Sequence, residues 1–83
     1  MEIAFIIPAY NEQGAIGKTI DSAKKIIPSS KIYVCDNNST DLTREEAISY
    51  GANVLVENRR GKGYAVRKLF SNVDADIYIM LDG

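Results

Sequence analysis

Aromatic and acidic side chains recur in this sequence directly after apolar segments. Tyr10 and Glu12 follow the first apolar segment, Asp36 ends the second, and Asp82 ends the last. A tyrosine ring offers a flat face on which a planar base can stack. A carboxylate at the end of a buried strand needs donors, and the imide of uracil or the N1–H and N2–H of guanine would supply them. These residue types therefore predict a nucleotide-binding site.

Residues 59–63 (RRGKG) combine three cations with two glycines after the third apolar segment. Glycine lets a backbone approach a ligand closely, and cations beside a helix N-terminus suit a phosphate. The spacing differs from that of the Walker P-loop, and no G-x-G-x-x-G run follows the first segment. The segment predicts a phosphate contact, with solvated loop charge as the alternative.

Each remaining candidate also has a structural alternative. Tyr10 could pack on the helix that follows it, and Asp36 could accept hydrogen bonds from the backbone of residues 37–41. Asp41 is expected to cap a helix rather than to bind a ligand. Asp82 is a single carboxylate, whereas Mg²⁺ and Mn²⁺ sites usually combine carboxylates with ligand phosphates. Metal binding at Asp82 would therefore be partial or indirect.

The elements that must position these residues alternate along the chain. Apolar, β-branched runs at residues 2–8, 31–35, 53–57 and 76–82 predict strands. Helical periodicity covers residues 13–27, which Pro28 ends, and residues 42–50, which Gly51 ends. A third helix is predicted after residue 63, and the residues on its apolar face are Val66, Leu69, Phe70 and Val73. The order βαβαβαβ predicts an α/β fold with a three-layer, Rossmann-like parallel sheet of strand order 3-2-1-4. All the candidate residues then meet at one edge of the sheet.

The composition excludes several classes of function. A net charge of −1 gives no reason to expect nucleic acid as a partner. The absence of histidine excludes a Ser-His-Asp or Cys-His catalytic system within these residues. The single cysteine, Cys35, cannot form an internal disulfide, which favours a reduced, cytoplasmic setting. No segment approaches the ~20 apolar residues of a membrane span.

Together these segments resemble the N-terminal half of a family 2 glycosyltransferase with the GT-A fold. Residues 6–12 (IIPAYNE) resemble the family's opening strand and loop, and residues 35–41 (CDNNSTD) resemble its DDGSTD turn. Residues 60–65 (RGKGYA) resemble its GKGxA segment, and residues 81–83 (LDG) the start of its D-x-D motif. The IPAYNE and GKGYA forms are similar to the branch that includes the polyprenyl- and dolichyl-phosphate sugar transferases.

The resemblance implies a binding site for a UDP- or GDP-sugar. Its residues would be Pro8, Ala9, Tyr10, Glu12, Asp36, Asn37, Gly61, Lys62, Gly63 and Asp82. Asp82 would be the first D-x-D acid, facing the ribose or a diphosphate bound to Mg²⁺ or Mn²⁺. The implied reaction is inverting sugar transfer to an unidentified acceptor, for which polyprenyl phosphate is one candidate. Asn37 and Asn38 replace the family's common Asp-Gly, which weakens a charge-based role at position 37.

We expect residues 1–83 to form a single partial domain, the donor-binding half of a larger enzyme. Without the acceptor site and the catalytic base, this chain alone should be inactive. The full-length enzyme would be cytoplasmic or peripheral at the membrane. The alternative is a non-catalytic nucleotide-binding or self-associating module, because the strand at residues 76–82 would leave apolar sheet surface uncovered. A receiver domain would need an acidic pair after the first strand, and a sugar nucleotidyltransferase a Gly-rich, basic opening loop.

Overall fold

The structure is a computed structural model that describes residues 1–82; residue 83, the last of the segment resembling the D-x-D motif, lies outside the described residues. Strands and helices alternate as predicted. In chain order they are β1 (Ile3–Ala9), α1 (Ile16–Ile26), β2 (Lys31–Asp36), α2 (Thr43–Ser49), β3 (Asn53–Val56), α3 (Lys62–Asn72) and β4 (Ile77–Met80).

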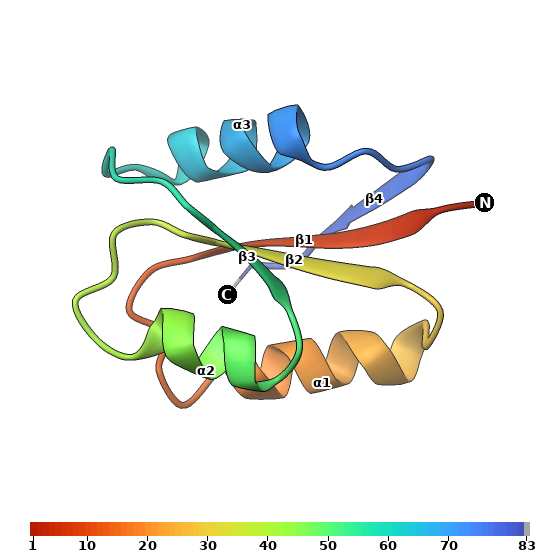
Figure 1. The fold of residues 1–83 in the computed structure, drawn as a ribbon, viewed down its shortest axis with the longest axis horizontal. Helices are drawn as coiled ribbons and strands as arrows, with labels where there is room; N and C mark the ends of the chain where they lie inside the picture. Colours follow the sequence, from red (N-terminus) through yellow and green to blue (C-terminus); the bar gives the residue numbers. More distant parts are fainter. Residues whose placement is uncertain (83) are drawn as a thin grey trace.

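All strand pairs are parallel, and the order across the sheet is β3-β2-β1-β4. The predicted α/β architecture and strand order are therefore confirmed. Helix α3 covers one face of the sheet, and α1 and α2 cover the other, which gives three layers (Figure 1). Because β1 and β4 are neighbours although three helices separate them in the chain, the sheet reverses its winding between them.

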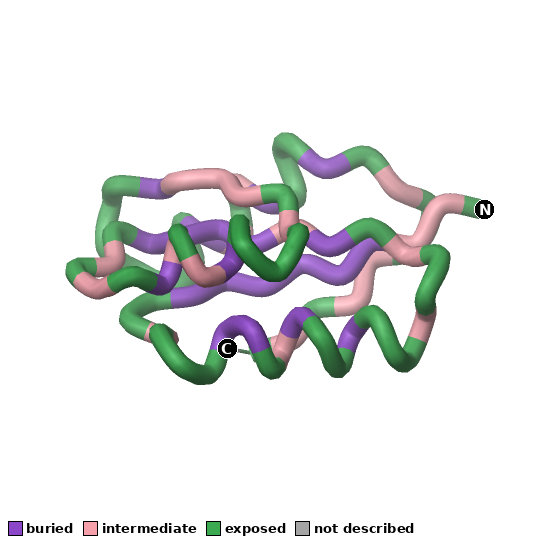
Figure 2. The backbone as a smooth tube through the Cα atoms, turned by 60° about the horizontal axis from the view of Figure 1, so that its bottom comes forward, coloured by how far each residue is buried: buried purple, intermediate pink, exposed green. Residues whose placement is uncertain are grey.

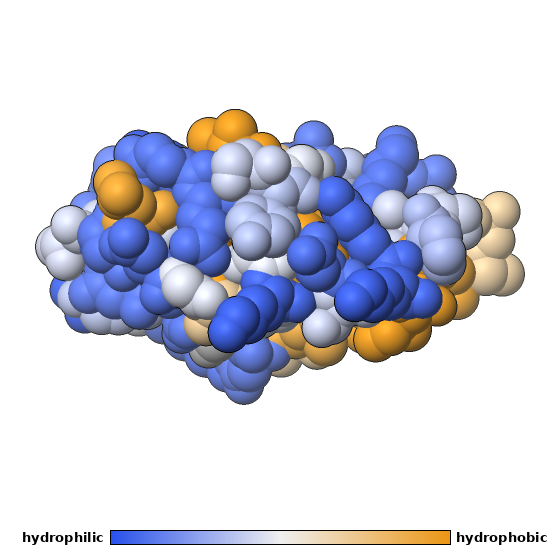
Figure 3. Space-filling view, turned by 90° about the horizontal axis from the view of Figure 1, so that it is seen from below, coloured by the Kyte–Doolittle hydropathy of each residue, from blue (hydrophilic) through white to orange (hydrophobic). Residues whose placement is uncertain are grey.

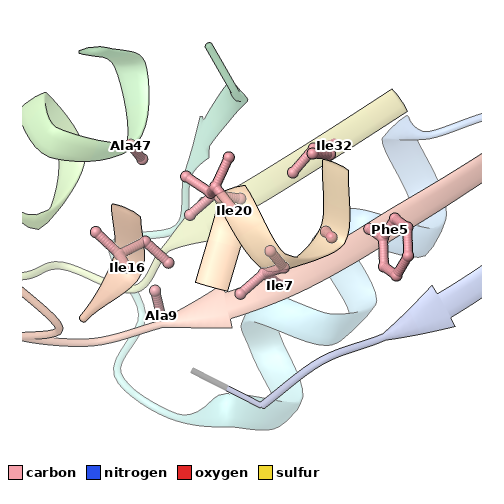
Figure 4. Packing of buried hydrophobic residues seen from close by; sticks show 9 residues of the cluster. Phe5, Ile7, Ala9, Ile16, Ile20, Ile32 and Ala47 are labelled. Atoms are coloured by element: carbon pink, nitrogen blue, oxygen red, sulfur yellow. The ribbon is translucent and has the colours of Figure 1, made fainter. Parts of the chain in front are cut away.

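The core consists of two apolar layers, one on each face of the sheet. Alternate residues of β1 point to opposite faces, so the strand contributes to both layers and is buried from Ala4 to Ala9. Figure 2 shows the buried residues concentrated along the central strands. The larger layer, between the sheet and α1 and α2, is shown in Figure 4 and contains Phe5, Ile7, Ala9, Ile16, Ile20, Ala23, Ile32, Val34 and Ala47.

The layer under α3 corrects one prediction. Phe70 was expected on the buried face of this helix, but it is 51% exposed, while Ala65, Leu69 and Val73 are buried. Helix α3 packs over β1 and β2, so the side chain of Phe70 lies at the margin of the contact. Its ring centroid lies 5.1 Å from that of Tyr78 on β4. The prediction for Phe70 was wrong because it sits beside, not within, the stripe that faces the strands.

The helix ends agree with the predicted signals, apart from shifts of a few residues. Gly51 follows α2 with φ of +89°, a conformation that glycine adopts readily. Asp41 lies one residue before the N-cap position of α2, which Leu42 occupies, and its Oδ1 accepts a hydrogen bond from the backbone amide of Thr43, the first helical residue, at 2.9 Å. Helix α1 begins at Ile16 rather than at residue 13, because residues 12–15 form a turn closed by hydrogen bonds to the Glu12 carbonyl.

The outer face formed by α1 and α2 is mostly hydrophilic, with isolated hydrophobic side chains (Figure 3). In residues 1–82, no helix has the length and apolar character needed to cross a membrane.

Candidate functional site

A cavity of about 350 Å³ opens at the edge of the sheet where the carboxyl ends of the strands lie. All the predicted site residues except Asp36 and Gly63 line it. The complete lining is Pro8, Ala9, Tyr10, Glu12, Asn37, Arg60, Gly61, Lys62, Ala65 and Asp82.

The sheet topology places this cavity between β1 and β4. Residue Ile6 of β1 pairs with Met80 of β4, so the segments after both strands leave the sheet side by side. In open α/β sheets, ligands bind at the point where the winding reverses, outside the carboxyl ends of the strands. The N-terminus of α3 adjoins the same cavity through Gly61 and Lys62.

Tyr10 presents its ring at the rim of the cavity. The ring is already stacked, because the guanidinium carbon of Arg60 lies 3.8 Å from its centroid. A planar cation over an aromatic face is stabilised by the ring quadrupole. Tyr10 is 36% exposed, so about a third of the residue is open to solvent at the cavity rim. The contact shows that the Tyr10 ring accepts a planar group on its face, and it adds Arg60 to the residues at the cavity.

Lys62 and Asp82 meet across the cavity as an ion pair. Both side chains are more than half exposed, at 54% and 68%. Exposed pairs of this kind contribute about 0–1 kcal/mol and are screened by salt. A ligand that offers a phosphate to Lys62, or a cation to Asp82, could therefore replace the pair at small cost.

Asn37 forms the wall between β2 and the segment after β3. Its Nδ2 donates hydrogen bonds to the carbonyl oxygens of Glu57 at 3.1 Å and Arg59 at 2.6 Å. Its Oδ1 accepts one from the amide of Gly61 at 2.9 Å. Gly61 has φ of +139°, which a residue with a side chain rarely adopts. Asn37 itself is 5% exposed, and its side chain is turned towards the backbone of residues 57–61.

Asp36 lies behind the cavity rather than in its lining. It is fully buried, and its Oδ1 accepts a hydrogen bond from the amide of Ser39 at 3.2 Å. The structural alternative for Asp36, that it accepts hydrogen bonds from its own turn, is confirmed. Its Oδ2 lies 3.1 Å from both Nε and Nη2 of Arg44, which neutralises the charge. Sequence reasoning missed Arg44, although a buried carboxylate requires such a partner.

Gly63 also lies outside the lining. It is exposed in the first turn of α3, and a Cβ atom at this position would have no neighbouring heavy atom within 4 Å. The close approach to a ligand that was expected of both glycines is therefore restricted to Gly61 in the lining.

The loop that carries Tyr10 and Glu12 is tied to the loop after β2 and to the first residue of α2. The Glu12 amide donates to Oγ1 of Thr43 at 2.7 Å. Asn11 Oδ1 accepts from the amide of Thr40 at 2.8 Å, and the Asn11 amide donates to Ser39 Oγ at 2.9 Å. These contacts fix the rim of the cavity through side chain–backbone hydrogen bonds between loops distant in sequence.

The basic segment has partners for each of its cations. Arg59 folds back on Glu57, whose carboxylate accepts from its backbone amide and its guanidinium at 2.8–3.1 Å. These hydrogen bonds lower the pKa of Glu57 to about 2. Arg60 lies on Tyr10 and Lys62 pairs with Asp82, but the side chains of Arg59 and Lys62 are 65% and 54% exposed, so the contacts leave the cations largely solvated. Nearby, burial raises the pKa of the Cys35 thiol to about 11.

The described residues do not form a metal site by themselves. Between residues 1 and 82, no three side chains of the His, Cys, Asp or Glu type come close enough together to hold an ion. Glu12 and Asp82 are the carboxylates in the cavity lining. A divalent cation at Asp82 would need further oxygen ligands, and a nucleoside diphosphate could supply them.

Comparison with known proteins identifies relatives for almost the whole chain. The sequence profile of the family described as Glycosyl transferase family 2 matches residues 4–83. Protein RfbJ of Shigella flexneri is 57% identical over 81 residues, which cover 98% of this chain and 63% of RfbJ. Glycosyltransferase AglJ of Haloferax volcanii is 37% identical over 82 residues, covering 98% of this chain and 27% of AglJ.

A solved structure gives the same match in three dimensions. The crystal structure of glucosyl-3-phosphoglycerate synthase from Mycobacterium tuberculosis, in complex with Mn²⁺, UDP and glucosyl-3-phosphoglycerate, superposes with a TM-score of 0.87 at 31% identity. The match covers 98% of this chain and 33% of that one. The chain thus spans less than two thirds of the length of these relatives.

Proposed function

Because the chain belongs to glycosyltransferase family 2 and has the Rossmann-like GT-A fold of that family, we propose that its cavity binds the nucleotide of a sugar-nucleotide donor. The observation that carries this proposal is the convergence of a stacking platform, a cation and a carboxylate on one cavity at the switch point of the sheet. Residues 1–83 then constitute a single partial domain, the donor-binding half of the enzyme.

Each part of the lining suits one part of such a donor. The base replaces the guanidinium of Arg60 on the ring of Tyr10, beside Pro8 and Ala9. Glu12 lies next to the nucleoside, within the same lining.

The diphosphate and the ribose occupy the other side of the cavity in this proposal. Lys62, at the start of α3, meets the diphosphate near the N-terminus of the helix. Asp82 turns from Lys62 to the ribose or to a cation on the diphosphate. Gly61 has no side chain that would project into the cavity. Gly63 contributes only the backbone of the first turn of α3.

Two observations on relatives favour UDP and a divalent cation. The mycobacterial synthase has been solved with UDP alone and with UDP and Mn²⁺. We extend this to the present chain as a proposal: Asp82 would hold Mg²⁺ or Mn²⁺ together with diphosphate oxygens, and the cation would stabilise the charge of the departing diphosphate.

The proposed reaction is inverting transfer of the sugar to an acceptor that a general base deprotonates. Polyprenyl phosphate is one candidate acceptor, because a dolichyl-phosphate hexose transferase of Haloferax volcanii is 30% identical over 98% of this chain and 36% of its own length. We place the base and the acceptor site outside residues 1–83, and expect this chain alone to transfer no sugar.

An NMR titration of the ¹⁵N-labelled chain tests the proposal. UDP and GDP are each added with Mg²⁺, and saturable shifts at Tyr10, Gly61 and Lys62 for one nucleotide are expected. Tyr10→Ala should weaken binding about tenfold, within the lower part of the range that base stacking contributes. The control is Tyr50→Ala, since Tyr50 is exposed to a similar extent, 39%, and does not line the cavity. Equal affinities for the two variants, or no saturable shifts, would refute the assignment.

Self-association is a second proposal, favoured by the surface around the edge strand β4. Phe70, Ile77 and Met80 are 51%, 40% and 48% exposed, and β4 has a strand neighbour on one side only. Exposed apolar edges promote pairing between chains. Sedimentation velocity between 10 and ~500 μM should show a dimer that Ile77→Lys abolishes. A monomer over the whole range would rule out this proposal.

A further inference from the structure

The side chain of Asn37 uses its hydrogen-bonding groups on the protein backbone rather than leaving them free for a nucleotide. A primary amide offers two N–H donors and one oxygen acceptor. In Asn37, Nδ2 is used twice, by the carbonyls of Glu57 and Arg59, and Oδ1 is used by the amide of Gly61. The residue is 5% exposed, so its remaining acceptor capacity is largely shielded from the cavity.

The three hydrogen bonds span one short segment. They begin at Glu57, the residue after β3, and end at Gly61, the residue before α3. The cations that reach the cavity, Arg60 and Lys62, flank Gly61 directly. Anything that fixes the backbone at residues 57–61 therefore fixes where these two side chains start.

We propose that Asn37 is a positioning residue, whose amide holds the backbone of residues 57–61 so that Arg60 and Lys62 are kept at the nucleotide cavity. The inference rests on the proposed function, and it changes the predicted role of Asn37 from ligand contact to support.

The need for an amide explains the residue type at this position. A carboxylate in the same place would accept from Gly61 but would set negative charge against two carbonyl oxygens at 2.6 and 3.1 Å. Protonation would restore one O–H donor and hence one of the two lost hydrogen bonds. The role therefore depends on donated hydrogens, not on charge or size.

Asn37→Asp tests this directly, with Asn38→Asp as the matched control. Both substitutions add one carboxylate to the same turn, but Asn38 is exposed and has φ of +63°, a conformation that aspartate tolerates. UDP affinity with Mg²⁺ is measured by titration calorimetry at pH 8 and pH 5. Relative to wild type, we expect Asn37→Asp to bind about tenfold more weakly at pH 8, because both hydrogen bonds donated by Nδ2 are lost, and Asn38→Asp to bind within about twofold.

The pH dependence separates positioning from general damage. The ratio of wild-type to Asn37→Asp affinity should shrink at pH 5, while the Asn38→Asp ratio stays constant. Burial beside two carbonyl oxygens raises the pKa of the carboxyl introduced at position 37, so that acid restores one donor there. Titration of the nucleotide itself cancels in both ratios. Equal affinities of the two variants at pH 8, or a ratio for Asn37→Asp that does not change with pH, would overturn the inference.

Measurements on the ligand-free chain keep this inference distinct from the proposed function. Hydrogens of the Asn37 side-chain amide should exchange more slowly than those of Asn38 in the same wild-type spectrum. In Asn37→Asp, ¹⁵N relaxation should report greater mobility at residues 58–61 than in Asn38→Asp. Equal exchange and equal mobility would refute the positioning role even if UDP binds. A wild-type chain that shows slow exchange but binds neither UDP nor GDP would refute the proposed function and leave the support of the segment by Asn37 established.

Discussion

Glu46 connects α2 to the start of α1, and its removal should destabilise the fold. Its Oε1 accepts a hydrogen bond from the amide of Gly14, and its Oε2 accepts one from Gly17, both at 2.8 Å. Helix α1 has no capping side chain of its own and no acidic residue in its first turn. The carboxylate from α2 therefore serves as the cap that the sequence around Ala15 lacks.

The expected loss in the free energy of unfolding follows from these two hydrogen bonds. Loss of a capping side chain costs about 1 kcal/mol, and loss of a negative charge at a helix N-terminus costs about 0.3–1 kcal/mol more. Because Glu46 is only partly buried, we take the sum as about 1.5 kcal/mol for Glu46→Ala. Glu46→Gln keeps one acceptor oxygen without the charge, so it should lose about half of this free energy.

Urea unfolding followed by circular dichroism measures the effect. For a domain of this size, a slope of about 1 kcal/mol/M converts the loss for Glu46→Ala into a midpoint lower by about 1.5 M. Glu45→Ala is the control, since Glu45 also lies in the first turn of α2 but is exposed. It should change the free energy of unfolding by less than about 0.5 kcal/mol. If the two alanine variants unfold at the same urea concentration, the capping of α1 by Glu46 is refuted.

Three further predictions concern single side chains. Cys35 should react with a thiol reagent at pH 8 only as fast as the chain unfolds, because the thiol is fully buried and its pKa is raised; rapid stoichiometric labelling of the native chain would contradict this. The lowered pKa of Glu57 means that its contact with Arg59 stabilises the fold above pH 4.5 and that this contribution disappears as the pH falls towards 2; the stability difference between wild type and Glu57→Gln should therefore vanish over that range in urea titrations. Lys62→Ala should weaken UDP binding about tenfold and reduce its salt dependence, whereas Lys68→Ala, which alters a lysine outside the cavity lining, should change neither in calorimetric titrations.

Much of the fold could be predicted because its signals are local or periodic. The continuous apolar run of β1 indicates a strand covered on both faces, and the helical spacing of Ile16, Ile20 and Ala23 predicts the buried face of α1. Phe70 shows the limit of this reasoning. A hydrophobic residue beside a helical stripe is buried only if another layer covers it, and β4 is an edge strand.

The site was predictable as a location but not as a set of contacts. Four strand ends at one edge bring Tyr10, Lys62 and Asp82 together, and this follows from parallel topology alone. The partners of Asp36 and Asn37 do not follow in this way. They depend on hydrogen bonds from side chains to a helix or a loop 3–24 residues away, for which the sequence has no periodic signal.

The contacts inside the cavity differ in kind from those that build its walls. Asn37 and Thr43 are buried and bind the backbone of other loops, so replacing them would leave donors or acceptors unpaired. The pairs of Lys62 with Asp82 and of Arg60 with Tyr10 lie at exposed positions and join side chains only. A planar base and a diphosphate offer Tyr10 and Lys62 equivalent or stronger partners without disturbing the walls. Nucleotide binding should therefore require side-chain exchange at the rim rather than movement of the backbone.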